Sequence, residues 1–191
     1  MRRPLGRLRI IGGEYRSRLI DFDADAGVRP TPDRVRQTVF DWLNLVIDGS
    51  SVLDLFAGSG ALGLEAVSRG AAQASFVETG AKQAEDIRSA IAKLGAAARC
   101  EVIRGDGIGF LRSTMNRFEV VFVDPPYDSP LLASTLANLP RVLKEMNRIY
   151  LEWPKGKPPV LPAGYSLLKE KAAGQVSYGL FTYAPPGEQP P

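Results

Sequence analysis

The stretch Val52-Leu53-Asp54-Leu55-Phe56-Ala57-Gly58-Ser59-Gly60-Ala61-Leu62-Gly63 decides the fold of this 191-residue chain. Its first five residues are typical of a buried strand, and good helix formers follow from Ala61 onward, after a glycine-rich turn. Gly58 and Gly60 let the backbone turn sharply and approach a ligand closely, because neither carries a Cβ. The free N–H groups of the first helical turn face the same place. The sequence therefore predicts a nucleotide-like cofactor at this turn.

Two carboxylates bear on the identity of that cofactor. Residues 58–63 spell the dinucleotide fingerprint, and Glu78 follows at about the expected distance. Asp54 argues against a dinucleotide, because its charge would repel a pyrophosphate but can help to hold the ammonium group of S-adenosylmethionine. Glu78 fits both cofactors, since it can accept hydrogen bonds from ribose hydroxyls. An NAD-dependent oxidoreductase and a turn built only for packing remain the alternatives.

A second apolar run, over residues 120–123, ends in a rigid polar turn. Pro125 and Pro126 stop the strand and fix the backbone beyond it. Their carbonyl oxygens and the Asp124 carboxylate form a group of acceptors beside the ring of Tyr127. These acceptors suit the exocyclic amine of a nucleobase, and Tyr127 can stack on the base once it has left its helix. The alternative is a strand-ending turn with a tyrosine in the core.

Strands and helices alternate along most of the chain, which predicts a parallel sheet with right-handed crossovers. The expected strands cover residues 52–56, 74–78, 100–104, 120–123 and 149–153. The expected helices cover residues 81–94, 107–115 and 131–144, and an antiparallel pair over 167–171 and 176–183 closes the sheet. Asp106 follows the third strand, where it can accept from an adenine amino group or equally cap the next helix.

Arginines alternate with apolar residues near the N-terminus, around Gly12-Gly13, which predicts a β-hairpin over residues 7–20. The polar face of this hairpin carries Arg7, Arg9, Arg16 and Arg18, the last two on the returning strand. A row of guanidinium groups suits the phosphates of RNA, while solvated arginines are the alternative. The acidic residues Asp21, Asp23 and Asp25 are expected in a solvated loop.

A proline-rich segment, Arg29-Pro30-Thr31-Pro32, precedes an amphipathic helix. We expect Thr31 as its N-cap and Asp33 at its positive end. Its first turn carries Arg34 and Arg36, and from the sequence alone their side chains and that of Arg29 could equally be solvated.

Composition bears on the kinds of partner, cofactor and cellular location that the protein can have. The net charge of +3 is compatible with a polyanionic partner but also with many soluble proteins. The single cysteine, Cys100, cannot form an internal disulfide and is expected to be a small core residue. Histidine is absent, so we expect neither histidine catalysis nor a metal site. No segment resembles a membrane span or a signal peptide, and we therefore expect a cytoplasmic protein.

Several motifs together carry a resemblance to a known family. Asp-Leu-Phe-Ala-Gly-Ser-Gly and Asp-Pro-Pro-Tyr resemble the class I S-adenosylmethionine-dependent amino-methyltransferases of nucleic acids. The chain is most similar to the RsmD-type enzymes that methylate guanine N2 in 16S ribosomal RNA. The hallmarks of these enzymes appear here over residues 9–13, 29–31, 33–36 and 175–178.

The resemblance implies a Rossmann-like α/β fold, with a mostly parallel doubly wound sheet, an antiparallel last strand and an N-terminal hairpin extension. It also implies that the substrate is the small ribosomal subunit, assembled or assembling. The segment with Arg29, Arg34 and Arg36 is expected, from the same resemblance, to border the active site and to touch RNA or cofactor. We expect an RNA-binding hairpin over residues 1–28, a methyltransferase domain over 29–184, a disordered tail over 185–191 and a monomer. Asp-Pro-Pro-Tyr alone does not distinguish guanine N2 from adenine N6, so adenine-N6 methylation is the alternative. The predicted site comprises catalytic Asp124, Pro125, Pro126 and Tyr127, and cofactor-binding Asp54, Phe56, Gly58, Gly60, Glu78 and Asp106.

Overall fold

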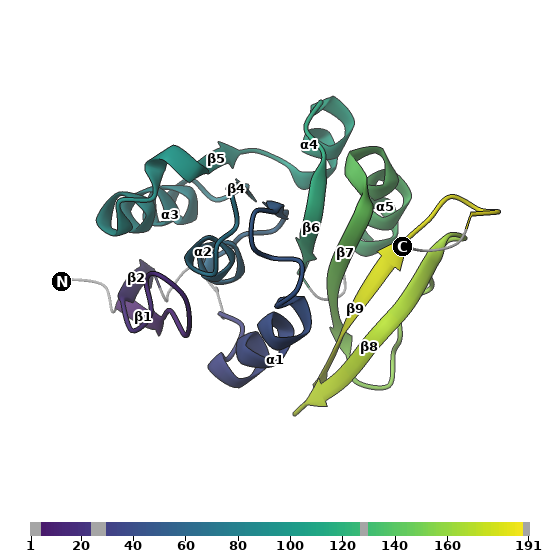
Figure 1. Cartoon of the computed structure of the whole chain (residues 1–191), viewed down its shortest axis with the longest axis horizontal. Coiled ribbons are helices and arrows are strands. Elements are labelled where there is room, and N and C mark those ends of the chain that lie inside the picture. The colour runs from purple at the N-terminus through teal and green to yellow at the C-terminus, as the bar shows by residue number, and fades with distance from the viewer. Residues whose placement is uncertain (1–4, 24–29, 127–129, 189–191) are drawn as a thin grey trace.

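A seven-stranded sheet organises the described part of the chain, which comprises residues 5–23, 30–126 and 130–188 of a computed structural model (Figure 1). The strand order is β5-β4-β3-β6-β7-β9-β8. Its parallel part consists of β3 (Ser51–Asp54), β4 (Gln73–Glu78), β5 (Cys100–Arg104), β6 (Phe118–Val123) and β7 (Leu143–Pro154). The antiparallel end consists of β9 (Val176–Tyr183) and the edge strand β8 (Tyr165–Ala173). The predicted mostly parallel sheet with an antiparallel end is confirmed.

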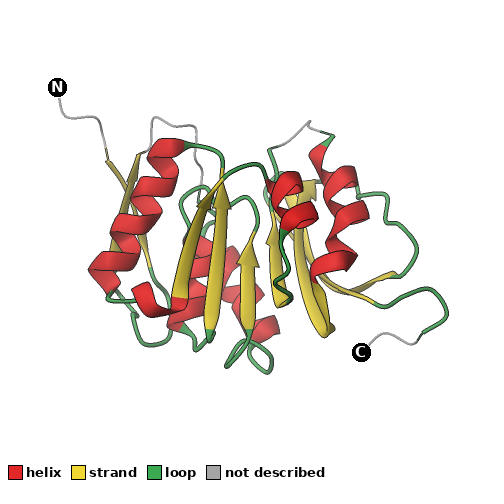
Figure 2. Ribbon diagram, turned by 90° about the horizontal axis from the view of Figure 1, so that it is seen from above, coloured by secondary structure: helices red, strands yellow, loops and turns green. Residues whose placement is uncertain are grey.

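Helices cover both faces of this sheet (Figure 2). One face packs against α1 (Asp33–Leu43), α2 (Ala61–Ser68) and α3 (Ala81–Leu94), and the other against α4 (Gly107–Ser113) and α5 (Leu131–Asn138). Short 3₁₀ helices cover Ala97–Arg99 and Leu139–Val142. Alternate residues of each central strand enter the two cores: Phe122 contributes to the α1 side, whereas Val121 and Val123 contribute to the other. The central strands are therefore buried on both faces, as in other doubly wound sheets, whereas the edge strand β8 is mostly exposed.

Several predicted boundaries were wrong. The helix expected over residues 107–115 ends at Ser113, and the strands expected over 120–123, 149–153 and 167–171 are longer, spanning Phe118–Val123, Leu143–Pro154 and Tyr165–Ala173. The helix expected over residues 131–144 ends at Asn138, and a 3₁₀ turn containing Pro140 leads directly into β7 at Leu143. Proline cannot donate the backbone hydrogen bond that a continuing α-helix requires. The first strand of the sheet ends at Asp54 and not at Phe56, because the turn begins two residues earlier.

The N-terminal arginine-rich segment forms a separate two-stranded sheet of β1 (Leu5–Arg9) and β2 (Leu19–Asp23). Arg16 and Arg18 lie in the connection between the strands, not on the returning strand as predicted. The acidic residues are not all in a solvated loop either. Asp21 and Asp23 belong to β2, Asp23 is buried, and Asp25 lies outside the described residues.

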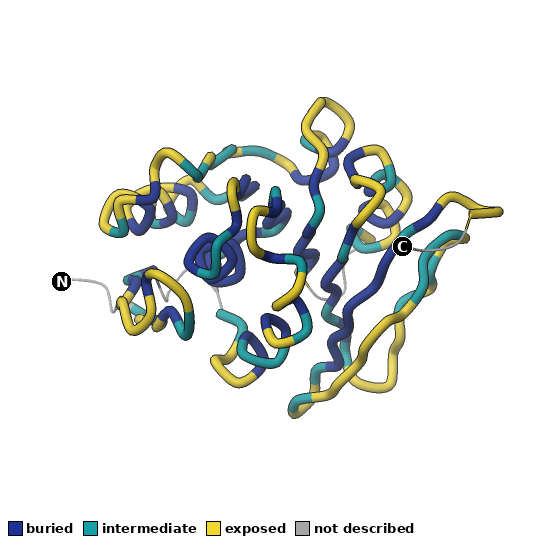
Figure 3. The backbone as a smooth tube through the Cα atoms, in the orientation of Figure 1, coloured by how far each residue is buried: buried dark blue, intermediate teal, exposed yellow. Residues whose placement is uncertain are grey.

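The connection between β1 and β2 is fixed to helix α2, which is buried along its whole length (Figure 3). Glu65 accepts from the backbone N–H groups of Ile11 and Gly12, both at 2.9 Å, and Ser68 Oγ donates to the Gly12 carbonyl over 2.6 Å. Gly13 adopts a φ of +76°, and a Cβ there would lie 1.8 Å from the Ser68 carbonyl oxygen. The two-stranded sheet is thus held against the larger domain by specific polar contacts.

Cys100 packs against the edge of the core and is only partly buried. Burial raises the pKa of its thiol to about 11, so the thiol stays protonated at neutral pH. In the described part of the chain, no helix is both long and apolar enough to cross a membrane.

Candidate active site

A cavity at the carboxyl end of β3 brings together residues from three separate stretches of the chain. Its lining combines Pro30 and Thr31, most residues of the stretch from Asp54 to Leu62, and Asp124 at the end of β6. Of the predicted site residues, the structure places Asp54, Phe56, Gly58 and Asp124 in this lining. The carboxyl end of the strands is also where ligands bind in doubly wound sheets.

The glycine-rich turn has the conformation that its glycines predict. Gly58 and Gly60 have φ values of +55° and +74°, in the left-handed region that a side chain strongly disfavours. Gly60 is the N-cap residue of α2, and Asp54 Oδ2 accepts from the N–H of Gly63 in the first turn of that helix over 3.0 Å. The carboxylate of Asp54 therefore fixes both the strand end and the helix start.

The environment of Asp54 disfavours its negative charge. The side chain is buried, and this burial raises its pKa to about 7 despite the hydrogen bond from Gly63, with a further contribution from the charge of Glu78. A cation placed in the cavity would counter this effect, because an opposite charge nearby favours the ionised carboxylate. The site is thus suited to a cationic group.

The two other carboxylates predicted to bind the cofactor, those of Glu78 and Asp106, accept hydrogen bonds from backbone N–H groups. Glu78 Oε2 accepts from Gly58 N–H over 2.8 Å and Oε1 from Gly80 N–H over 2.7 Å, so it links the turns after β3 and β4. Asp106 accepts from Gly109 N–H over 2.7 Å, which confirms it as the N-cap of α4. Their contacts with ribose and adenine stay predictions.

Asp124 lies at the end of β6, beside further negative charge. Burial raises its pKa to about 8, and the charges of Glu152 and Asp54 add to this rise. Pro125 is buried and Pro126 is exposed, while Tyr127 lies outside the described residues. The Asp124 carboxyl therefore keeps its proton to a higher pH than an ordinary aspartate does.

Sequence reasoning missed two residues beside Asp124, namely Glu152 and Tyr150 of β7. Tyr150 OH donates to Glu152 Oε1 over 2.5 Å, and Thr31 Oγ1 donates to the same oxygen over 3.5 Å. Thr31 is consequently not the N-cap that we predicted; Pro32 occupies that position. The sequence feature that could have indicated Glu152 is its position near the carboxyl end of the predicted strand over 149–153, where ligands bind in such sheets.

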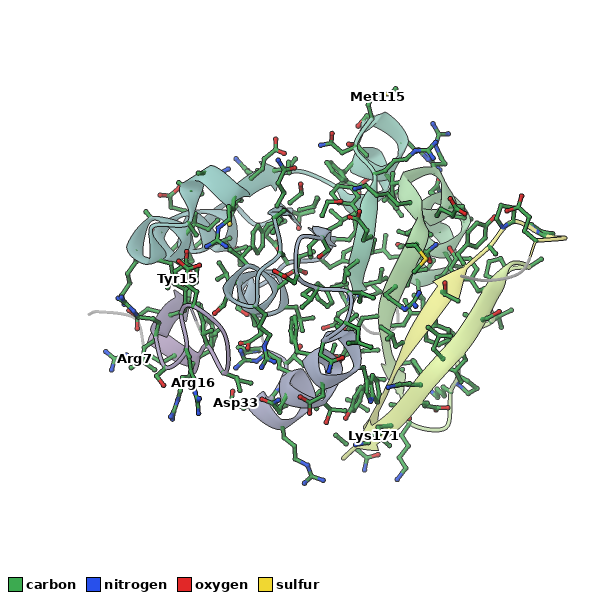
Figure 4. The ribbon with its side chains drawn as sticks, in the orientation of Figure 1. Arg7, Tyr15, Arg16, Asp33, Met115 and Lys171 are labelled. Carbon is green, nitrogen blue, oxygen red and sulfur yellow. The ribbon has the colours of Figure 1, made fainter. Side chains whose placement is uncertain are left out.

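The predicted RNA-binding arginines separate into two groups. Arg7, Arg9, Arg16, Arg18 and Arg34 are exposed, and Figure 4 shows Arg7 and Arg16 extending outward. Arg36 is the exception, because its side chain is 1% exposed and donates to the carbonyls of Arg9 and Thr31. Arg36 is therefore a structural residue and is not available to RNA. Arg29 lies outside the described residues.

Comparison with known proteins shows that the similarity covers nearly the whole chain. The profile of a family described as "Conserved hypothetical protein 95" matches residues 8–182. The chain is 41% identical over 186 residues to "Ribosomal RNA small subunit methyltransferase D" of Escherichia coli K12, covering 96% of this chain and 93% of that protein. It is 40% identical over 181 residues to the protein of the same name from Haemophilus influenzae, with coverages of 92% and 94%.

Solved structures agree with the sequence comparison. The putative methyltransferase yhhF from Escherichia coli superposes with a TM-score of 0.84 at 41% identity, covering 93% of this chain and 98% of that one. The putative methylase HI0767 from Haemophilus influenzae gives a TM-score of 0.78 at 38% identity, with coverages of 92% and 98%. The resemblance read from the motifs is confirmed: the chain belongs to the RsmD family of methyltransferases.

Proposed function

We propose that this protein transfers a methyl group from S-adenosylmethionine to the exocyclic N2 of a guanine in 16S ribosomal RNA. The observation that carries the proposal is the presence of Asp54 and Asp124 in one cavity, at the ends of neighbouring parallel strands. One carboxylate suits the ammonium group of the methyl donor, and the other suits the amine that accepts the methyl group. A dinucleotide fits less well, because the buried charge of Asp54 would oppose a pyrophosphate.

The donor site consists of the turn after β3 and the ends of the next two strands. Asp54, Phe56, Gly58 and Gly60 would hold the methionine part, while Glu78 and Asp106 would accept from the ribose and the adenine. The sulfonium of bound S-adenosylmethionine supplies a methyl group that is already activated for transfer. The protein has mainly to align the amine with that methyl group, and alignment alone contributes several kcal/mol to catalysis.

Asp124 and the Pro125 carbonyl orient the target amine in this proposal. Both accept hydrogen bonds from it, which directs its lone pair toward the methyl group. The amine nitrogen becomes acidic once it is methylated, so its proton leaves without a strong base and the absence of histidine is no obstacle. The target base must leave its stack to reach the cavity, and Tyr127 would stack on it.

The exposed arginines supply the proposed RNA contacts. Arg7, Arg9, Arg16 and Arg18 project from the N-terminal extension, which is fixed to α2 through Glu65 and Ser68. We propose that residues 1–28 bind RNA, that residues 29–184 carry out catalysis, and that the protein acts as a monomer on the small subunit. The names of the curated relatives support a small-subunit RNA as substrate.

The test is transfer of labelled methyl groups from S-adenosylmethionine to small ribosomal subunits that lack the modification, followed by nucleoside analysis of the RNA. N2-methylguanosine at a single position is expected. N6-methyladenosine would instead establish the alternative activity. Failure to label subunits, naked ribosomal RNA and DNA, with cofactor binding intact, would contradict the proposed substrate.

A further inference from the structure

A second carboxylate stands beside Asp124, and the proposed reaction gives it no role so far. Val123 of β6 pairs in parallel register with Leu151 of β7, so Asp124 and Glu152 follow at equivalent positions. Residues at equivalent positions of neighbouring strands point to the same face of a sheet, about 5 Å apart. The influence of the Glu152 charge on the pKa of Asp124 is consistent with this proximity. The strand register therefore places Glu152 next to Asp124, which lines the cavity.

Glu152 is held in its position by a rigid tyrosine. Tyr150, whose OH donates to Glu152 over 2.5 Å, is itself fully buried between Phe122 and Tyr178, with ring centroids 6.1 and 6.2 Å away. Tyr178 belongs to the 175–178 motif, which thus supports Glu152 from the neighbouring strand β9. The glutamate is half-buried, and its contact Thr31 also lines the cavity. A carboxylate fixed in this way can act as a directional acceptor.

We infer that Glu152 determines base specificity by accepting a hydrogen bond from N1–H of the target guanine while Asp124 accepts from its N2 amine. This inference rests on the proposed function. Guanine presents two adjacent donors, N1–H and the N2 amine, and two neighbouring carboxylates are complementary to them. Adenine and cytosine present an acceptor nitrogen beside their amine, and a carboxylate facing that nitrogen would place two acceptors in opposition.

The Asp-Pro-Pro-Tyr motif alone does not make this distinction, because the exocyclic amines of all three bases satisfy its acceptors. Glu152 supplies the missing contact from a different strand. It is therefore a residue that selects the base, whereas Asp124 and Pro125 orient the amine that reacts.

The test uses small subunits reconstituted with 16S RNA that carries either guanine or 2-aminopurine at the methylated position. 2-Aminopurine keeps the exocyclic amine but has an acceptor nitrogen in place of N1–H. The wild-type protein is expected to prefer guanine by at least about 100-fold in kcat/KM, since sites built around a hydrogen bond strongly reject analogues that lack it. Glu152→Gln should narrow this preference by at least about tenfold, because its amide can donate to the acceptor of 2-aminopurine.

Three matched variants make the result interpretable. Glu152→Asp keeps a side chain that only accepts, so it should slow both reactions without narrowing the preference. Glu152→Asn repeats the amide test with a shorter side chain, in case the glutamine variant folds poorly. Glu170→Gln makes the same change at an exposed position of β8 and should leave both rates unchanged.

The outcomes separate this inference from the proposed function. If the wild-type protein forms no N2-methylguanosine, the proposed function fails and the inference fails with it. If N2-methylguanosine forms but the amide variants keep the wild-type preference, only the role of Glu152 is overturned. A tenfold or greater loss of S-adenosylmethionine affinity in Glu152→Gln would assign the carboxylate to the cofactor and also overturn the inference.

Discussion

Arg36 and Glu65 form an ion pair inside the protein, with Nη1 3.4 Å from Oε2 and side chains that are 1% and 0% exposed. The same glutamate accepts from two N–H groups of the β1–β2 connection and from Arg69 Nε over 2.7 Å. Arg36 in turn donates to the carbonyls of Arg9 and Thr31. A single buried pair therefore connects the proposed RNA-binding extension, helix α2 and the segment that borders the active site.

Arg36→Ala should destabilise the protein by about 3 kcal/mol, because it removes one buried partner of Glu65 and leaves the carbonyls of Arg9 and Thr31 without their donor, although Arg69 still pairs with Glu65. Urea unfolding would measure the change in free energy. Arg34→Ala on the same helix is the matched control, since Arg34 is exposed and its loss should cost at most about 0.5 kcal/mol. Equal effects of the two substitutions would show that the buried pair contributes no more than a surface arginine.

Gly13→Ala tests the attachment of the extension to α2. The new Cβ would meet the Ser68 carbonyl at 1.8 Å, and the φ of +76° adds strain of about 1 kcal/mol. Gly49 has a similar φ of +72°, but a Cβ there would have no heavy atom within 4 Å, so Gly49→Ala carries the strain without the clash. We expect Gly13→Ala to lower the unfolding free energy by at least about 2 kcal/mol and Gly49→Ala by about 1 kcal/mol. Indistinguishable unfolding curves for the two variants would argue against the contact.

Asp124→Ala should reduce methyl transfer by at least about 100-fold, the effect of losing one oriented hydrogen-bonding group in an active site. Binding of S-adenosylmethionine should change little, because the proposed cofactor contacts come from other residues. Single-turnover rates and calorimetric cofactor titration would separate the two properties. Transfer at the wild-type rate would refute the proposed contact with the amine.

Stability should fall as the pH rises from about 4 to about 8. Asp54 and Asp124 have pKa values near 7 and 8 in the folded protein, compared with an ordinary value of 3.8. The folded state consequently holds more protons than the unfolded state over this range, and stability declines with pH wherever that is so. Urea unfolding at several pH values should show a smaller decline for Asp54→Asn, which cannot ionise. A decline as steep as that of the wild-type protein would contradict the raised pKa of Asp54.

The salt dependence of RNA binding tests the arginine surface. Replacing Arg16 and Arg18 by alanine should weaken binding and reduce the slope of log K against log salt by about 0.7 to 0.9 for each phosphate that the protein no longer neutralises. Arg112 and Arg141 are also exposed but lie on α4 and on the 3₁₀ helix Leu139–Val142, so their double replacement is the control. If only the control pair changes the slope, the RNA surface lies elsewhere.

Local sequence patterns determined the order and type of most elements. The helix over residues 81–94 and the strands over 100–104 and 176–183 were predicted with the observed bounds, because periodicity and capping residues act over a few neighbouring positions. The glycine-rich turn was predicted for the same reason. Family resemblance then supplied the reaction class, which the relatives support.

Only the tertiary structure decided how the arginines and carboxylates are used. Arg34 and Arg36 look equivalent in the sequence, yet one is solvated and the other is buried against Glu65. Glu152 was overlooked because its proximity to Asp124 depends on the register of two strands that are far apart in the sequence. Burial and strand register arise from contacts between distant segments, so no local pattern contains them.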